Sequence, residues 1–418
     1  MLDSFALADV PPITGHEHAD IFLDALSIAL IYRDPALAER RGAALYDHLS
    51  GCTGRGWLVG FDDADWQWER YGRPNGHSAF AVSGLAAHLE QVESLLDAYR
   101  YLDLRPEWLW HTGAAVGVDP VAAIPLRSAC EGVDTAALRA QVCDRLRLDG
   151  RPVLALMDLP GVDRVDVRLL CGWESAGDVV LGRALEQGHL TDNSGPHGYF
   201  RLADWESQVL AVFGIGGEEA AEWDVAPGLR AARNGLRLGA SRDDGTRHYG
   251  LRAYDAWADA LLDEAWIDGH DDHTLGQRLL YHSACAGTIA CQKAFCRLPA
   301  ADAQGMGVIN GYMWRAASSP GIIHGLMWDV WQVVGGYWRG VGPAMGPHWL
   351  TWSGAEEIAR FRRREVRERA VAVLKRAREV DAQALADLDT VARDWMVCRG
   401  RGQQHPCPCW GTIGCERV

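Results

Sequence analysis

The stretch from Arg151 to Arg183, RPVLALMDLPGVDRVDVRLLCGWESAGDVVLGR, predicts three β-strands. PVLALMD is a compact apolar run of the kind that forms a buried strand, and ESAG is a turn between the two strands that follow. Upstream, helical spacing begins at Thr135 and stops at Gly150, and downstream SQVLAVFGIGG at 207–217 is a further strand. A helix followed by closely spaced strands predicts an antiparallel sheet and an α+β fold.

The flanking segments are helical. DIFLDALSIALIYRD is apolar on almost every side, which is typical of a buried central helix, and Asp20 stands before it as a good N-cap. After residue 217 the strands are expected to cease. The boundaries expected are therefore an α+β domain over 1–217, a helical domain over 218–397 and a Cys-rich tail over 398–418.

Two local patterns carry further expectations. LSGCTGRGWLVG reads as loops and short strands because of its glycines. The basic run from Arg360 to Arg369 is interleaved with Glu365 and Glu368 at helix-pair spacing, which favours a solvated helix face over a docking patch.

Composition limits the classes of function. With 418 residues and a net charge of −15, the chain is not expected to bind nucleic acid, because phosphate neutralisation drives that affinity. No signal peptide or continuous apolar span is apparent, so no membrane association and a cytoplasmic location are expected. In that compartment the eleven cysteines stay reduced. A small-molecule or peptide substrate is the expected partner, and oligomer formation stays open.

A family resemblance rests on GRPVLALMDL, VRLLCGWESAGDVVLGR, DW at 204–205 and VLAVFGI. Together these segments resemble the second half of the papain-like module in BtrH-type acyltransferases of butirosin biosynthesis and in C39-like peptidases. DIFLDALSIAL resembles the central helix of that module. The resemblance implies a papain-like (C39/BtrH-like) α+β domain followed by an all-α helical domain, with acyl or amide chemistry in natural product biosynthesis.

The resemblance also implies a catalytic site that this chain has lost. The catalytic cysteine of the family would fall at Ala19 or Asp20, its histidine partner at Asp166, and the orienting residue near Arg183. None of these positions carries the expected group, so the thiol mechanism cannot operate there. Cys52, in the Gly-rich SGCTG, is an alternative nucleophile, although a free cysteine is more often a small core residue.

GHEHAD offers a replacement site directly before the central helix. His16, His18 and Asp20 alternate along the chain, so an extended backbone would direct all three to one side. Two imidazoles and a carboxylate with open positions suit catalytic Zn²⁺ or non-haem Fe(II). Asp166 would then be a fourth ligand or a general base. The competing interpretation makes Asp20 a simple helix cap and leaves the two histidines exposed.

Other segments rich in metal-ligating or aromatic groups have simpler interpretations. In DGHDDHTLGQ, Asp271 or Asp272 is expected to cap a helix, and a metal site with His270 and His273 is the alternative. His282, Cys285, Cys291 and Cys296 are expected to be buried helix residues. The tryptophans of residues 324–352 are expected to pack in a helical core rather than line a ligand pocket.

The tail RGQQHPCPCWGTIGCERV gathers Cys407, Cys409 and Cys415. These thiols, with His405 or Cys398, could bind a soft ion such as Zn²⁺ or Cu(I), although C-x-C is a poor match to the usual C-x₂-C knuckle. The tail could instead be a peptide substrate for modification, as in ribosomally made, modified peptides. Docking of Trp410 onto the body and an ordinary mobile terminus are the remaining alternatives.

These observations lead to one functional hypothesis and two alternatives. The leading hypothesis is a specialised-metabolism enzyme on a degenerate papain-like scaffold, with a His/Asp site in place of Cys-His. The first alternative is a metal-dependent hydrolase or oxygenase that uses Zn or Fe. The second is a non-catalytic binding or carrier protein.

Overall fold

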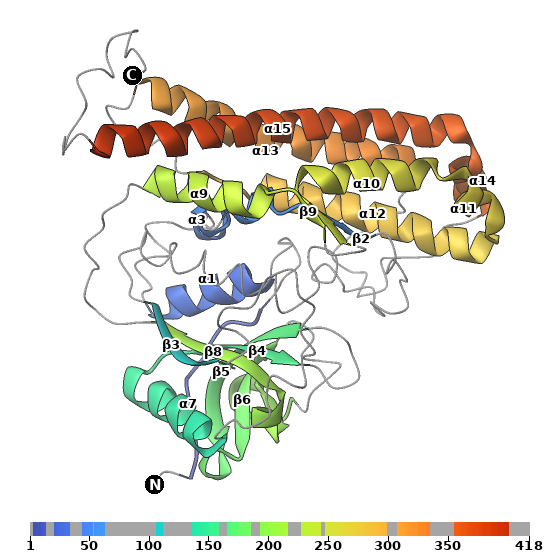
Figure 1. Ribbon diagram of the computed structural model, residues 1–418. Helices are drawn as coiled ribbons and strands as arrows, with labels where there is room; N and C mark the ends of the chain where they lie inside the picture. The colour runs from blue at the N-terminus through green and yellow to red at the C-terminus, as the bar shows by residue number, and fades with distance from the viewer. Residues whose placement is uncertain are drawn as a thin grey trace. The chain divides into compact units, whose positions relative to one another are not determined.

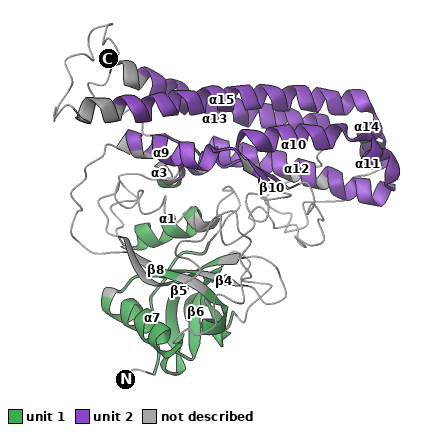
Figure 2. Cartoon of the chain, viewed as in Figure 1, with its two compact units in different colours: residues 1–46, 82–222 green, residues 47–81, 223–418 purple. Residues whose placement is uncertain are grey.

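The structure is a computed structural model with two compact units, residues 1–46 with 82–222 and residues 47–81 with 223–418 (Figure 2). It describes residues 3–13, 21–33, 44–52, 54–62, 106–111, 135–158, 165–184, 193–215, 227–243, 247–298, 307–334 and 355–400. The fold is mixed α+β and mostly helical, with an antiparallel sheet in the first unit, so the expected fold class is confirmed at this level.

The first unit contains a seven-stranded antiparallel sheet of strand order β3-β8-β4-β5-β6-β7, with β1 paired to the far end of β5. The predicted strands of residues 153–215 all form. Their bounds are β1 Phe5–Ala6, β3 Pro106–His111, β4 Val153–Asp158, β5 Val165–Glu174, β6 Val179–Ala184, β7 Phe200–Ala203 and β8 Val209–Ile215.

Two helices pack on this sheet, α1 Ile21–Arg33 and α7 Thr135–Asp149. Figure 1 shows them on opposite sides of the strands. Three consecutive residues of β5, Leu169 to Cys171, are fully buried, as a strand covered on both faces requires. Helix α1 is buried along most of its length, which confirms the predicted central helix.

The ESAG turn between β5 and β6 forms as predicted. Ser175, Ala176 and Gly177 all have positive φ angles, of 52°, 56° and 101°, and form the short 3-10 segment η4 Ser175–Gly177. Trp205 Nε1 donates to Gly177 O at 3.0 Å, so a buried indole holds the turn in place. The other 3-10 segments of this unit are η5 Pro196–Gly198 and η6 Trp205–Gln208.

The second unit is a set of helices around two apolar clusters, the larger formed mainly by α10, α12, α13 and α15. None of the helices in the described ranges is both long and apolar enough to cross a membrane. Their bounds are α9 Pro227–Gly239, α10 Leu251–Leu262, α11 Glu264–Gly269, α12 Asp272–Ala294, α13 Gly307–Val334, α14 Ala355–Arg362 and α15 Arg364–Gly400.

The expectation that strands cease after residue 217 is wrong. Strands β9 Arg242–Asp243 and β10 Arg247–Tyr249 form a three-stranded sheet with β2 Gly60–Asp62. Strands β9 and β10 are short and polar, and β2, with which β10 pairs, lies far away in sequence. The alternation of apolar and polar residues that predicts a strand is therefore missing here. LSGC of the glycine-rich stretch is also helical, at the end of α3 Ala44–Cys52, and the 3-10 segment η1 Arg55–Trp57 follows.

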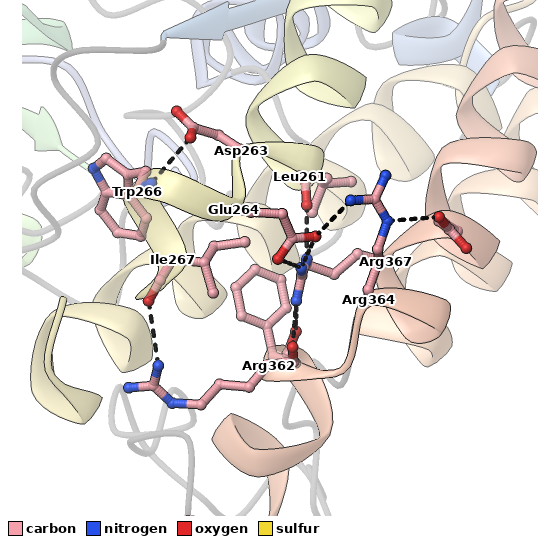
Figure 3. Close-up of polar contacts among 10 residues, drawn as sticks. Leu261, Asp263, Glu264, Trp266, Ile267, Arg362, Arg364 and Arg367 are labelled. Atoms are coloured by element: carbon pink, nitrogen blue, oxygen red, sulfur yellow. Dashed lines mark hydrogen bonds and ion pairs between the residues drawn. The ribbon is translucent and has the colours of Figure 1, made fainter. Parts of the chain in front are cut away.

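The interpretation of the basic run as a solvated helix face is also wrong in part. The chain breaks its helix at Arg363 between α14 and α15, and Arg367 is 1% exposed. Its Nε donates to Leu261 O at 2.8 Å, its Nη1 to Phe361 O at 2.7 Å, and its Nη2 to both carboxylate oxygens of Glu264 at 2.6 Å (Figure 3). The guanidinium turns inward because the helix corner leaves carbonyl groups that need donors.

Helix α13 continues through Pro320, which has no N–H to donate to Ala316 O. Ser319 Oγ donates to that carbonyl at 2.8 Å and thereby satisfies it. The hydroxyl therefore explains how a 28-residue helix tolerates an internal proline.

Candidate functional site

Most of the predicted site residues lie outside the described part of the chain. Helix α1 begins at Ile21, directly after GHEHAD, and the GHEHAD segment lies outside the described residues. The same holds for the end of the tail. The residues concerned are His16, His18, Asp20, Cys407, Cys409 and Cys415.

Asp166 is the second residue of β5, and its backbone pairs with Met157 of β4. Only the backbone of Asp166 belongs to the described part of the structure. Helix α1 packs against both β4 and β5. The helix that follows GHEHAD and the strand that carries Asp166 are therefore neighbours in the first unit.

Arg183, near which the family resemblance would place the orienting residue, makes contacts that hold the fold together. Its Nε donates to Val10 O at 3.0 Å, its Nη1 to Gly198 O at 2.8 Å and its Nη2 to His197 O at 2.8 Å. Its guanidinium carbon also lies 4.5 Å from the ring centre of Tyr199. These contacts fasten the N-terminal segment to the loop that precedes β7.

Tyr199 completes that attachment. Its hydroxyl donates to Leu7 O at 2.9 Å and accepts from Val10 N at 3.0 Å. Burial raises the pKa of Tyr199 to about 12, so the phenol stays protonated as the donor to Leu7 requires. This part of the first unit is consequently built for rigidity rather than for proton transfer.

The described thiols are poor nucleophiles. Burial raises the pKa of Cys143 to about 11 and that of Cys171 further still, so neither forms a thiolate near neutral pH. In the second unit, Cys285 and Cys296 are buried small residues, as predicted, and Cys291 is half-buried. Cys52 is the last residue of α3, and its side chain lies outside the description.

DGHDDHTLGQ forms a helix start, as predicted. Asp271 is the N-cap of α12 and accepts from Thr274 N at 2.9 Å, which lowers the pKa of this carboxyl. His270 stacks on Trp266 with ring centres 4.1 Å apart. Within the described ranges, no three histidine, cysteine or acidic side chains come together as a metal site.

The small sheet of the second unit contains a carboxylate–imidazole pair that sequence reasoning missed. His248 Nδ1 lies 2.5 Å from Asp243 Oδ1, and Arg252 Nε lies 3.4 Å from Asp243 Oδ2. The pKa of Asp243 is lowered, mainly by the hydrogen bond from His248. In the neutral imidazole, a proton on Nδ1 that is bound by Asp243 would place the lone pair on Nε2, which is the nitrogen that a general base uses.

The same face of the small sheet carries Phe61. His248 of β10 lies opposite both Phe61 of β2 and Asp243 of β9, and directly paired residues share a face of the sheet. Phe61 is buried, and its ring stacks 6.2 Å from the ring of His282 on α12. The polar pair is therefore next to Phe61, a member of the larger of the two apolar clusters described above.

His282 has a fixed tautomer. Trp257 Nε1 donates to its Nδ1 at 2.9 Å, and an indole N–H can only donate, so the proton of the neutral ring is on Nε2. Burial, and secondarily Arg278, lowers the pKa of His282 well below 6.5. No residue of the described ranges accepts a hydrogen bond from Nε2. His282 in this state is a donor, since a base or a metal ligand would need a lone pair there.

Comparisons with known proteins add no relative. No protein-family profile, curated protein or solved structure matches the chain.

Proposed function

We propose that the first unit is a papain-like scaffold for acyl- or amide-directed chemistry in specialised metabolism, with a His/Asp site in place of the thiol site. The supporting observation is the pairing of α1 with β4 and β5, because this contact brings the helix after GHEHAD to the strand that carries Asp166. The antiparallel order β4-β5-β6 with its tight turn is compatible with the same module.

Within the described part of the first unit, the thiols and Arg183 favour a mechanism that does not use cysteine. Cys143 and Cys171 have raised pKa values, and the guanidinium of Arg183 is engaged with three backbone carbonyls. On this proposal Asp166 removes a proton from water or from an acceptor substrate. His16 and His18, with Asp20, hold a Zn²⁺ or Fe(II) ion that would polarise the acyl carbonyl.

Metal analysis of protein purified without an affinity tag tests the metal part of the proposal. We expect about one equivalent of Zn or Fe, lost in His16→Ala/His18→Ala. The matched control is His270→Ala/His273→Ala, which removes another closely spaced histidine pair and should leave the metal in place. Metal lost only on removal of residues 401–418 would place the ion in the tail and contradict the assignment to the first unit.

Hydrolysis of p-nitrophenyl acetate tests the catalytic part. We expect Asp166→Asn to lower the rate by about 100-fold or more, as for loss of a general base, and Cys52→Ala to leave it unchanged. Loss of activity in Cys52→Ala alone would instead make Cys52 the nucleophile. An inactive wild-type protein against ester and anilide probes would favour the binding or carrier class.

A second candidate function places proton transfer in the second unit. It is favoured by the 2.5 Å contact between Asp243 and His248, since a neutral imidazole that donates Nδ1–H to Asp243 would have Nε2 as its basic nitrogen. The same ester assay separates the two candidates. Activity lost in His248→Ala and retained in Asp166→Asn would assign the reaction to the small sheet.

A further inference from the structure

Helix α13 has one exposed side in the second unit. Between Gly311 and Val334, five of the exposed residues follow one another at alternating intervals of three and four: Arg315, Ser318, Ile322, Gly325 and Asp329. We refer to these five residues as the α13 stripe. Such spacing keeps side chains in one line along a helix and is the repeat that helices use to pair with each other.

The middle of the stripe is apolar. Ile322 is 51% exposed, and Trp314, beside the first residue of the stripe, is 57% exposed. Together with Leu148 of α7, they are the exposed large hydrophobic residues of the described ranges. Trp314 and Ile322 are eight residues apart, about 80° around the helix from each other, so together they give the exposed side of α13 a broad apolar area of the kind that marks a contact surface.

Gly321 and Gly325 flank Ile322 on this exposed side. A Cβ atom added at either position would meet nothing within 4 Å. Glycine inside a helix is less favourable than alanine, and here no neighbour in the chain requires it. A second helix that approaches closely at this point would require it.

The charges at the two ends of the stripe define the partner. Arg315 and Asp329 each lie seven residues from Ile322, on opposite sides of it. In an antiparallel pair with a two-fold axis at Ile322, Arg315 of each copy meets Asp329 of the other. A parallel pair would align like charges instead. Arg315 is held for this role by Asp387 through bonds of 3.1 and 3.0 Å, while its side chain stays 56% exposed.

We propose that the α13 stripe is a self-association surface, at which two copies of this chain pair antiparallel about a two-fold axis at Ile322. The self-complementary placement of Arg315 and Asp329 fits an isologous contact, in which the same patch serves both copies. The glycines Gly321 and Gly325 permit close approach of the two helices, and Trp314 and Ile322 supply the apolar area of the contact.

Sedimentation velocity of the full chain over a range of concentrations tests the proposal. The wild type should show a monomer–dimer equilibrium, and Ile322→Arg should weaken it at least about tenfold. Leu148→Arg is the matched control, since it changes an even more exposed hydrophobic residue of another helix and should leave association unchanged. A wild type that is monomeric throughout, or an unaffected Ile322→Arg protein, would overturn the proposal.

Cysteine cross-linking tests the antiparallel orientation. Across the two-fold axis, Ile322→Cys meets its own copy and should form an intermolecular disulfide, identified by the mass of the linked peptide. Asp329→Cys should not, because the two sites would lie about 21 Å apart along the helix, beyond disulfide reach. Efficient self-linking of both variants would mean a parallel pair and would contradict the proposal.

Gly325→Ala separates pairing from folding. Alanine should raise the thermal midpoint of the unit because it favours the helix, and it should weaken the dimer because it blocks close approach. If glycine has no role in pairing, the midpoint rises while the dimer affinity stays the same, which argues against the proposed contact.

Discussion

Lys293 Nζ lies 2.8 Å from Asp381 Oδ1 and 3.0 Å from Oδ2, with both side chains buried inside the helical unit. Tyr254 donates to Asp381 Oδ2 at 2.7 Å, and the ammonium lies 4.6 Å from the ring centre of Trp57. The pair thus joins α12 to α15, with partners from α10 and from η1. A buried ion pair of this kind is costly to break from one side.

Removing the carboxylate should strongly destabilise the second unit. Asp381→Asn leaves the Lys293 charge buried without a counter-ion, and we expect a loss of about 3–5 kcal/mol in the free energy of unfolding. Urea denaturation measures it. Asp389→Asn, which removes the exposed partner of Arg393, is the control and should change stability by less than about 1 kcal/mol. Equal effects of the two variants would contradict this account.

Arg367 and Arg364 both contact Glu264 but should differ in their contribution to stability. Arg367→Met leaves the carbonyls of Leu261 and Phe361 without a donor, at a cost of about 3 kcal/mol or more. Arg364→Met removes an exposed ion pair and should cost less than about 1 kcal/mol. Thermal and urea unfolding of the two variants compare them directly. A larger loss of unfolding free energy in Arg364→Met than in Arg367→Met would contradict the structural role of the buried Arg367 guanidinium.

His282 predicts a loss of stability on acidification. Its pKa in the folded state is lowered below 6.5 by burial, so the unfolded chain binds a proton that the folded chain does not. The stabilisation is fully present above pH 6.5 and is lost as the pH falls below it, by about 1.4 kcal/mol per pH unit.

The test of this pH dependence compares the wild type with His282→Asn. The Asn oxygen can still accept from Trp257, but the side chain does not titrate. Between pH 7.5 and pH 5.5, the free energy of unfolding should fall by more in the wild type than in His282→Asn. Parallel pH profiles would show that His282 is not the group responsible.

Acylation by diethyl pyrocarbonate should distinguish His248 from His324. The reagent attacks an unprotonated ring nitrogen, and in the neutral form of His248 a proton on Nδ1, bound by Asp243, leaves Nε2 as that nitrogen. In His324, Ala290 O binds Nδ1 at 2.8 Å and Trp328 Nε1 donates to Nε2 at 3.2 Å. Peptide mass spectrometry should therefore show faster modification of His248 than of His324. In Asp243→Asn, His248 should react severalfold more slowly than in the wild type. Preferential labelling of His324 would count against the base assignment.

Local sequence patterns predicted much of the fold where the cause is local. The apolar run 153–158 forms a strand, the positive-φ turn forms at ESAG, and Asp271 caps α12. Each depends on residues within a few positions of one another. The site of His16, His18 and Asp20 stays a proposal because that segment lies outside the described residues, and the papain-like assignment stays one because no known protein matches the chain.

The errors and omissions arise where distant segments meet. Asp243 and His248 are unremarkable in sequence until β10 pairs with β2, and Arg367 resembles its exposed neighbours until the corner between α14 and α15 turns it inward. No periodicity encodes such contacts, since they depend on how separate elements pack.

The sequence by itself therefore determined the α+β class, the buried helix α1 and the strands β4, β5, β6 and β8 of the first sheet, because burial periodicity and turn chemistry act over short distances. Only the tertiary structure decided the tautomer of His282, the Asp243–His248 pair and the ion pair of Lys293 with Asp381. Each of these requires partners from different elements, and their hydrogen bonds and desolvation exist only once those elements have packed together.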